Sequence, residues 1–221
     1  MDPREDEKRA AAQAAAEAVE DGSTLGLGTG STVAHFLPAL ARRGLNVRCV
    51  ATSPVTEEAA RALGLAVDPF DLLDRLDLAV DGADQVAPDL WLIKGGAGAH
   101  TREKVVAASA ERFLVIVSSD KLVDALRPPV PVEVLRFGLS ATMKRLSEIG
   151  PVEPRESGPT PDGNVIVALT GPIGEPASLS AALDSEPGVV GHGLFAPELV
   201  SEVLVGRPGG AVDRLPAGGS R

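Results

Sequence analysis

Apolar runs and amphipathic segments alternate along the first half of the chain. Strand-like runs stand at residues 24–28, 46–53, 76–84 and 112–120. Segments with helix-forming residues or apolar residues at helical spacing stand at 5–19, 31–44, 54–64 and 101–110. Apolar strands that alternate with helices are typical of a parallel sheet covered on both faces. We therefore predict a Rossmann-like α/β domain.

The pattern changes after residue 126. Strand-like runs at 131–137, 152–156, 164–170 and 188–195 enclose helical segments at 140–150 and 177–186. This β-α-β-β-α-β order predicts a smaller ferredoxin-like α+β domain at 127–198. The run at 199–207 is expected to return to the Rossmann-like domain at 1–126. Residues 208–221 are rich in Gly, Pro and Ala, so we expect a disordered tail.

Composition narrows the classes of function. A hydrophobic fraction of 44% indicates a buried core, and the net charge of −10 argues against binding to nucleic acid or to an anionic membrane. No apolar run reaches the length of a membrane span, and the charged start lacks the apolar part of a signal peptide, so we expect a cytoplasmic protein. The single cysteine and three scattered histidines show no ligand spacing. We therefore predict no metal site.

A glycine turn, GLGTGST, lies between the first strand and the second helix at residues 26–32. Such a turn lets the backbone approach a ligand, and the helix start favours an anion. It lacks the third glycine of a dinucleotide fingerprint, where Ser31 stands, and the lysine of a P-loop. A plain tight turn with a serine cap remains the alternative. The hydroxyls of residues 52–59 could likewise contact a ligand or cap the next helix.

Charged residues cluster in the segment from Asp81 to Lys104. Asp81 and Asp84 follow an apolar strand, on the side where parallel sheets bind ligands. Lys94 follows the apolar LWLI at a glycine bend, a position that solvation explains poorly. Glu103 falls in the first turn of a helix, where the helix dipole also favours a carboxylate. Turn formation by Asp84 and capping by Glu103 are the alternatives.

Lys121 stands at the end of another strand, where a surface lysine is the alternative. Taken together, the strand ends offer anion donors, a carboxylate base and lysines able to stabilise an oxyanion. That inventory favours proton transfer next to a carbonyl in a phosphorylated sugar. Among the histidines, His35 is expected to pack or face solvent, His100 could contact a ligand, and His192 is given no role.

Several motifs in this order resemble the type A family of ribose-5-phosphate isomerases. The motifs are GLGTGST, TSPVTEEA, DGADQV, LIKGGAGAHTREK, PVPVEV, DGN and PGVVGHGLF. The resemblance covers nearly the whole chain except the C-terminal tail. It implies a cofactor-free isomerisation of D-ribose 5-phosphate to D-ribulose 5-phosphate through an enediolate, in the pentose phosphate pathway. It also implies a homodimer or homotetramer.

The resemblance carries roles for individual residues. Glu103 would move the proton between C2 and C1, and Lys94 would stabilise the enediolate oxygen. Asp81 and Asp84 would hold hydroxyls and assist ring opening. Substrate binding would be completed by Thr29, Gly30, Ser31, Thr32, Gly82, Ala83, Gly95, Gly96, Ala97, Lys121 and Lys8. The motifs do not say which cluster binds the phosphate.

The chain departs from the family pattern at several positions, and two of them follow Lys94. Ala97 interrupts a run of four glycines, and His100 replaces a leucine. A side chain at Ala97 excludes some left-handed conformations, so the loop geometry is in question.

Two other functions share parts of this pattern. A coenzyme A transferase would use a glutamate as a covalent nucleophile but needs a groove for a large nucleotide. A sugar-phosphate sensor of the DeoR type would carry a helix-turn-helix, whereas one alanine-rich helix precedes the first strand here.

Overall fold

The computed structural model describes residues 3–156 and 158–217 and divides the chain into two compact units. Unit 1 comprises Met1–Ala83, Arg102–Leu122 and Pro197–Arg221, and unit 2 comprises Asp84–Thr101 and Val123–Ala196. Within the described residues, no helix is long and apolar enough to cross a membrane.

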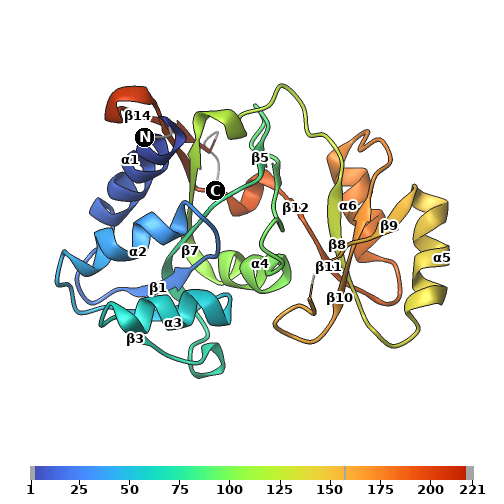
Figure 1. Cartoon of the computed structure of the whole chain (residues 1–221), viewed down its shortest axis with the longest axis horizontal. Coiled ribbons are helices and arrows are strands. Elements are labelled where there is room, and N and C mark those ends of the chain that lie inside the picture. Colours follow the sequence, from blue (N-terminus) through green and yellow to red (C-terminus); the bar gives the residue numbers. More distant parts are fainter. Residues whose placement is uncertain (1–2, 157, 218–221) are drawn as a thin grey trace. The chain divides into compact units, whose positions relative to one another are not determined.

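Unit 1 is built on a seven-stranded sheet (Figure 1). Its strands are β1 (Thr24–Leu27), β2 (Arg48–Ala51), β3 (Ala66–Val67), β4 (Leu76–Asp81), β7 (Ala110–Ser118), β13 (Glu202–Gly206) and β14 (Val212–Pro216). The order is β14-β13-β7-β4-β1-β2-β3, and all neighbours are parallel except β13 and β14. The direction of winding reverses between β1 and β4, where doubly wound sheets bind ligands beyond their carboxyl ends.

Helices cover both faces of this sheet. They are α1 (Pro3–Glu17), α2 (Val33–Ala41), α3 (Pro54–Ala62) and α4 (His100–Ala108), with short 3-10 helices η1 (Phe70–Leu72), η2 (Ser119–Lys121), η3 (Pro197–Leu199) and η4 (Pro208–Gly210). Leu25 and Leu27 pack in one core with α1 and α2, which lie side by side in Figure 1. Gly26, between them, faces Val106 of α4. Alternate residues of β1 therefore contact helices on opposite faces.

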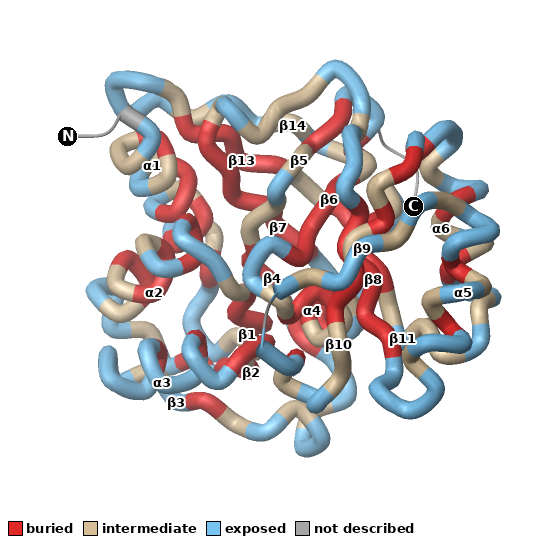
Figure 2. The backbone as a smooth tube through the Cα atoms, turned by 45° about the vertical axis from the view of Figure 1, so that its right-hand side comes forward, coloured by how far each residue is buried: buried red, intermediate tan, exposed pale blue. Residues whose placement is uncertain are grey.

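Alanine brings α1 close to the sheet. The helix is alanine-rich, a composition with high helix propensity, and its buried alanines belong to the main core. A side chain on Gly206 of β13 would lie 1.8 Å from the Glu7 carbonyl oxygen of α1. The absence of side-chain bulk on both elements thus lets their backbones touch. Figure 2 shows β13 as a buried strand, and only its first residue, Glu202, is partly exposed.

Unit 2 contains a four-stranded antiparallel sheet with two helices on one face. Its elements are β8 (Val130–Val134), α5 (Leu139–Ile149), β9 (Val152–Pro154), β10 (Val165–Leu169), α6 (Pro176–Asp184) and β11 (Val189–His192). The order β11-β8-β10-β9 and the β-α-β-β-α-β sequence are those of a ferredoxin-like fold. Alternate residues of β8, namely Val130, Val132 and Val134, pack against α5 and α6.

A second, three-stranded sheet completes unit 2. It has the order β12-β6-β5, formed by β5 (Gln85–Val86), β6 (Leu92–Ile93) and β12 (Leu194–Phe195). The β5–β6 hairpin pairs with β12, so Asp84–Thr101 clusters with unit 2. The structure thus differs from the sequence-based division, which kept this segment in the first domain. The expected strands at 76–84 and 188–195 also end earlier, at Asp81 and His192. After each of these residues the chain continues into a strand of the three-stranded sheet, β5 or β12.

The α/β fold class is confirmed. Strand β13 pairs parallel with β7 in the seven-stranded sheet, and it falls within the segment 199–207 that the sequence analysis assigned to the first domain. The expected disordered tail is wrong for residues 208–217, because β14 pairs antiparallel with β13. Gly209 and Gly210, read as signs of disorder, have φ of 81° and 86° and form the turn before β14. The last residues of the expected tail, 218–221, lie outside the described residues.

Candidate active site

Asp81 is the last residue of β4 and lies at the reversal point of the seven-stranded sheet. Its side chain is 3% exposed. Oδ1 accepts hydrogen bonds from the backbone N–H of Thr29 at 3.1 Å and of Gly82 at 2.7 Å. These donors fix the carboxylate at the carboxyl end of the strand.

Gly28 lies directly against Asp81. A Cβ atom on Gly28 would lie 1.9 Å from the Asp81 Cγ, a distance that no real Cβ contact allows. The Gly28 N–H donates to the Val80 carbonyl at 2.9 Å, so the backbone cannot move away without losing that bond. Sequence reasoning assigned the glycines of this turn to ligand approach. At Gly28 the close neighbour is the carboxylate.

A cluster of hydroxyls holds the side chain of Thr29. Its Oγ1 hydrogen-bonds Thr52, Ser53 and Thr56 at 2.8, 2.8 and 3.0 Å. Thr56 in turn donates to the Gly28 carbonyl at 2.9 Å. Ser53 also caps α3 by accepting from the Thr56 N–H at 3.2 Å. The capping reading of this segment is therefore correct, and the same hydroxyls position the glycine turn.

The rest of the turn leads into α2. Gly30 has φ of 144° and is exposed, as is Ser31. Thr32 is the N-cap residue of α2 and makes no side-chain capping bond. The start of a nine-residue helix thus carries backbone donors next to the exposed Gly30–Ser31 segment, an arrangement suited to an anion.

Lys8 and Lys121 lie on elements that are joined to each other. Lys121 belongs to η2, immediately after β7, and its Nζ is 3.7 Å from Asp120 Oδ2. The buried Glu7 of α1 accepts a hydrogen bond from the Ser119 N–H of η2 at 2.7 Å. Lys8, the next residue of α1, is therefore on a helix fixed to the turn that carries Lys121.

Lys8 pairs with a carboxylate of its own helix. Its Nζ is 2.7 Å from Glu5 Oε1, and Glu5 Oε2 is 2.8 Å from His35 Nε2 of α2. The hydrogen bond from Lys8, and then that from His35, lowers the pKa of Glu5. His35 thus has a structural partner on α1, consistent with the packing role expected for it.

Glu103 lies in the first turn of α4, as expected, and is 3% exposed. Val106, three residues further on, faces Gly26 of β1 so closely that a Cβ on Gly26 would lie 2.3 Å from Val106 Cγ1. Residues three apart share one face of a helix. Glu103 therefore lies on the side of α4 that packs on the sheet of unit 1.

The other predicted charged residues lie in unit 2, at the ends of the β5–β6 hairpin. The Asp84 N–H donates to the Ile93 carbonyl at 2.8 Å, which places Asp84 beside Lys94 across the hairpin. Lys94 is 3% exposed, and its Nζ is 5.4 Å from the ring centroid of Phe195. The face of an aromatic ring attracts an ammonium group. Phe195, which sequence reasoning did not single out, thus helps hold the Lys94 side chain.

The backbone conformation of the glycine loop after Lys94 shows why an alanine can stand at position 97. Gly95 and Gly98 have φ of 116° and 81°, which favour glycine. A Cβ on Gly96 would lie 2.7 Å from Asp84 Oδ1. Ala97 is exposed, and among the described non-glycine residues only Leu90 has positive φ. The departure from the family pattern therefore falls where the backbone makes no demand for glycine.

His100 supports this loop from within unit 2. It begins α4 and is fully buried. A Cβ on Gly95 would lie 2.9 Å from its Nδ1. The imidazole is thus packed against the loop backbone.

Arg155 contacts the same loop from a position much later in the sequence. It follows β9, and its guanidinium donates to the carbonyls of Gly95 and Gly96 at 2.7 and 2.5 Å. No motif around Arg155 marks it, because the contact joins residues about sixty positions apart.

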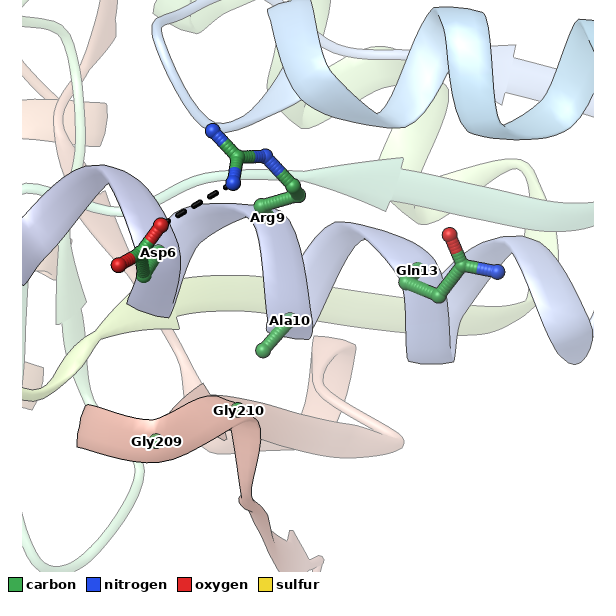
Figure 3. Close-up of a pocket in the computed structure, with 6 residues that line it drawn as sticks. All are labelled: Asp6, Arg9, Ala10, Gln13, Gly209 and Gly210. Carbon is green, nitrogen blue, oxygen red and sulfur yellow. Dashed lines mark hydrogen bonds and ion pairs between the residues drawn. The ribbon is translucent and has the colours of Figure 1, made fainter.

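One open groove lies away from these residues. It has a volume of about 410 Å³ and is formed in unit 1 by α1 and η4 (Figure 3). Its lining residues are Asp6, Arg9, Ala10, Gln13, Gly209 and Gly210. Asp6 and Arg9 pair with each other at 3.0 Å. None of the predicted site residues lines it. Within residues 3–156 and 158–217, no group of three or more His, Cys, Asp and Glu side chains could hold a metal ion.

Fold and site together define an α/β enzyme of the doubly wound class, with buried ionisable side chains at strand ends. Residues 48–210 match the family model of ribose 5-phosphate isomerase A (phosphoriboisomerase A). The chain belongs to this family of isomerases.

Named relatives agree with this assignment. The chain is 46% identical over 224 residues to ribose-5-phosphate isomerase A of Caulobacter sp. (strain K31), covering 96% of this chain and 99% of the relative. The crystal structure of ribose 5-phosphate isomerase A from Neisseria gonorrhoeae matches with a TM-score of 0.90 and 32% identity, over 95% and 96% of the two chains. A D-ribose-5-phosphate isomerase in complex with phospho-erythronic acid matches with a TM-score of 0.87 and 37% identity, over 95% and 97%.

Proposed function

We propose that this protein interconverts D-ribose 5-phosphate and D-ribulose 5-phosphate through an enediolate. Membership of the family and the likeness to an isomerase that binds phospho-erythronic acid, a phosphorylated sugar acid, support this substrate class. The observation that carries the mechanism is the burial of three ionisable side chains, Asp81, Lys94 and Glu103, each 3% exposed. Buried charged groups of this kind are rare outside functional sites or paired networks.

Glu103 is the base in this proposal. It takes the proton from C2 of the open-chain aldose and returns it to C1, while the electron pair of the C2–H bond forms the enediolate. Its burial in the first turn of α4 keeps water from competing for that proton. Asp81, held by the N–H groups of Thr29 and Gly82, binds a sugar hydroxyl and assists ring opening.

Lys94 stabilises the negative charge that develops on the enediolate oxygen. An ammonium group fixed before the reaction, here over the Phe195 ring, stabilises such charge without reorganising. Asp84, beside Lys94 across the hairpin, serves the proton exchange between the oxygens on C1 and C2. The backbones of Gly82, Ala83 and Gly95 to Ala97 complete the sugar subsite.

The phosphate subsite is proposed for unit 1. The helix start at Thr29–Thr32 offers backbone and hydroxyl donors, and Lys8 and Lys121 lie on two elements joined through Glu7 and Ser119. Two ammonium groups and a helix N-terminus match the charge of a phosphate dianion. Binding requires Lys8 to exchange part of its contact with Glu5 for the ligand.

The wider setting is also a proposal. We place the enzyme in the non-oxidative pentose phosphate pathway of the cytoplasm, as a homodimer or homotetramer. Light scattering on the purified protein would measure the oligomeric state, and a monomer at working concentration would contradict this part of the proposal.

The deciding experiment uses purified protein with a chelator and D-ribose 5-phosphate in heavy water. Ribulose 5-phosphate should form, and any deuterium taken up from the solvent should be at C1, because Glu103 returns the proton to that carbon. Glu103→Gln should lose at least about 1,000-fold in kcat and still bind substrate. Glu148→Gln, on the exposed face of α5, is the matched control and should retain full activity.

Three outcomes would contradict the proposal. Wild-type protein that converts no phosphopentose would remove the isomerase function. Full turnover by Glu103→Gln would remove Glu103 as the base. A reaction that needs added coenzyme A would favour the transferase.

A further inference from the structure

The peptide unit between Gly95 and Gly96 is held at both ends. Its carbonyl, on Gly95, accepts a hydrogen bond from Arg155 Nη1 at 2.7 Å. Its N–H, on Gly96, donates to Asp84 Oδ2 at 2.8 Å. Because the two groups of a trans peptide point in opposite directions, Arg155 and Asp84 lie on opposite sides of the loop.

The next peptide unit has the same orientation toward Arg155. The Gly96 carbonyl accepts from Arg155 Nη2 at 2.5 Å. Its N–H belongs to Ala97 and therefore points away from the guanidinium. Within the described part of the chain, no hydrogen bond is formed by this Ala97 N–H. Because Arg155 binds both carbonyls, the two backbone N–H groups of this segment point away from it. The Gly96 N–H points toward Asp84, and the Ala97 N–H has no protein acceptor among the described residues.

We propose that Arg155 is a positioning residue for the proposed sugar subsite. By fixing the carbonyls of Gly95 and Gly96, it holds the Gly96 N–H on Asp84 and aims the Ala97 N–H at an oxygen atom of the substrate. It also restrains the backbone that follows Lys94. This inference rests on the proposed function, and it assigns the restraint to a residue that never touches the substrate.

The chemistry of arginine suits this role. The guanidinium is planar and carries paired donors in a fixed fork, which two neighbouring carbonyls can accept together. Arg155 is also anchored by its backbone, since its N–H donates to the Ile166 carbonyl of β10 at 3.2 Å. Its side chain is half-buried, which limits its other conformations. A lysine has no such fork and would hold the two carbonyls less rigidly.

The first test compares Arg155→Met with Arg145→Met. Arg145 is the matched control because it is also half-buried in unit 2 and donates to a carbonyl, that of Pro187 at 2.6 Å, away from the loop. Arg155→Met should lower kcat by about 10- to 100-fold with little change in KM, since oriented donors act mainly on the developing charge. Arg155→Lys should recover part of that loss. Arg145→Met should keep kcat within about twofold of wild type.

The second test does not depend on activity. Amide exchange at Gly96 should speed up in Arg155→Met and stay unchanged in Arg145→Met. In Arg155→Ala, added guanidinium ion should restore part of kcat, whereas urea at the same concentration should not. These readouts separate loss of the guanidinium from a general loss of stability.

The outcomes are distinguishable from failure of the proposed function. If the wild-type protein is inactive, the proposed isomerisation is wrong. Amide exchange at Gly96 then still tests whether Arg155 holds the loop backbone. Active wild-type protein, with kcat of Arg155→Met within twofold of it or with unchanged Gly96 exchange, would overturn the inference.

Discussion

The backbone N–H of Thr29 donates a 3.1 Å hydrogen bond to Oδ1 of Asp81. This bond joins the ends of β1 and β4, the two strands between which the winding of the sheet reverses. It couples the glycine turn to the proposed catalytic carboxylate. A change in either one should therefore be felt by the other.

Gly28→Ala should lower kcat/KM strongly, although the substitution adds only a methyl group. The added Cβ would lie 1.9 Å from Asp81 Cγ, so the carboxylate or the turn must move. A displacement of about 1 Å at a catalytic group can cost about 100-fold in kcat/KM. Gly158→Ala is the control, because nothing lies within 4 Å of its Cβ position and its φ is not positive. Equal kinetics of the two variants would contradict the coupling.

Glu7→Ala should weaken both folding and binding of phosphate. The Ser119 N–H would lose its acceptor, at a cost of about 1–3 kcal/mol in the free energy of unfolding. Because Lys121 lies on the same short helix, KM and the inhibition constant for inorganic phosphate should rise together. Glu7→Gln retains an acceptor oxygen and should behave nearly as wild type. A binding loss equal in both variants would rule out this hydrogen bond as the cause.

Cys49 predicts how stability changes at high pH. It is fully buried in β2, and burial, with a smaller effect of Asp68, raises the pKa of its thiol to about 12. The folded state therefore keeps the proton above pH 9, where the unfolded chain releases it. Stability should fall by about 1 kcal/mol per pH unit between pH 9 and 12 through this group.

Denaturant unfolding of wild type and Cys49→Ala at pH 8 and pH 11 measures this linkage. The alanine variant should be less stable at pH 8, because it leaves a cavity, but should lose less stability on going to pH 11. The native thiol should also resist alkylation at pH 8. An identical pH dependence in the two proteins would refute the assignment.

The carboxylate of Asp77 should have the opposite effect, a loss of stability as the pH becomes low. Hydrogen bonds from the Thr24 backbone N–H and hydroxyl, at 2.7 and 2.8 Å, lower the pKa of Asp77. The contribution of Asp77 to folding stability is thus present above the pKa that this group has in the unfolded chain. It is lost as the pH falls through the lower pKa that it has in the folded protein. Asp77→Asn should cost about 1 kcal/mol at pH 7, a modest amount because the site is exposed.

The gap between wild type and Asp77→Asn should close as the pH falls below about 4. Turnover should not change, because Asp77 lies at the amino end of β4 and the proposed site at its carboxyl end. A lower kcat in this variant would show that the two ends of the strand are coupled.

The sequence predicted what depends on long periodic segments. Apolar strands alternating with helices predict a covered parallel sheet, and the carboxyl-end rule then directs attention to Asp81 and Lys121. The structure places both at strand ends. Their roles in catalysis and binding stay predictions.

The sequence did not reveal what depends on short elements and distant contacts. The strands β5, β6 and β12 have two residues each, too few to show any alternation. Without them, Asp84 is assigned to the wrong unit. The contacts of Arg155 with the loop and of Glu7 with Ser119 join residues that are 60 and 112 positions apart. No local pattern encodes such pairs.

The place of β13 and β14 in the chain has a consequence for synthesis. Both strands follow the last residue of unit 2, so a ribosome makes all of unit 2 before the sheet of unit 1 can be finished. Until then, the edge of β7 that later pairs with β13 has no partner. A nascent chain stalled after Ala196 should therefore carry an open apolar strand edge, the kind of surface that chaperones bind.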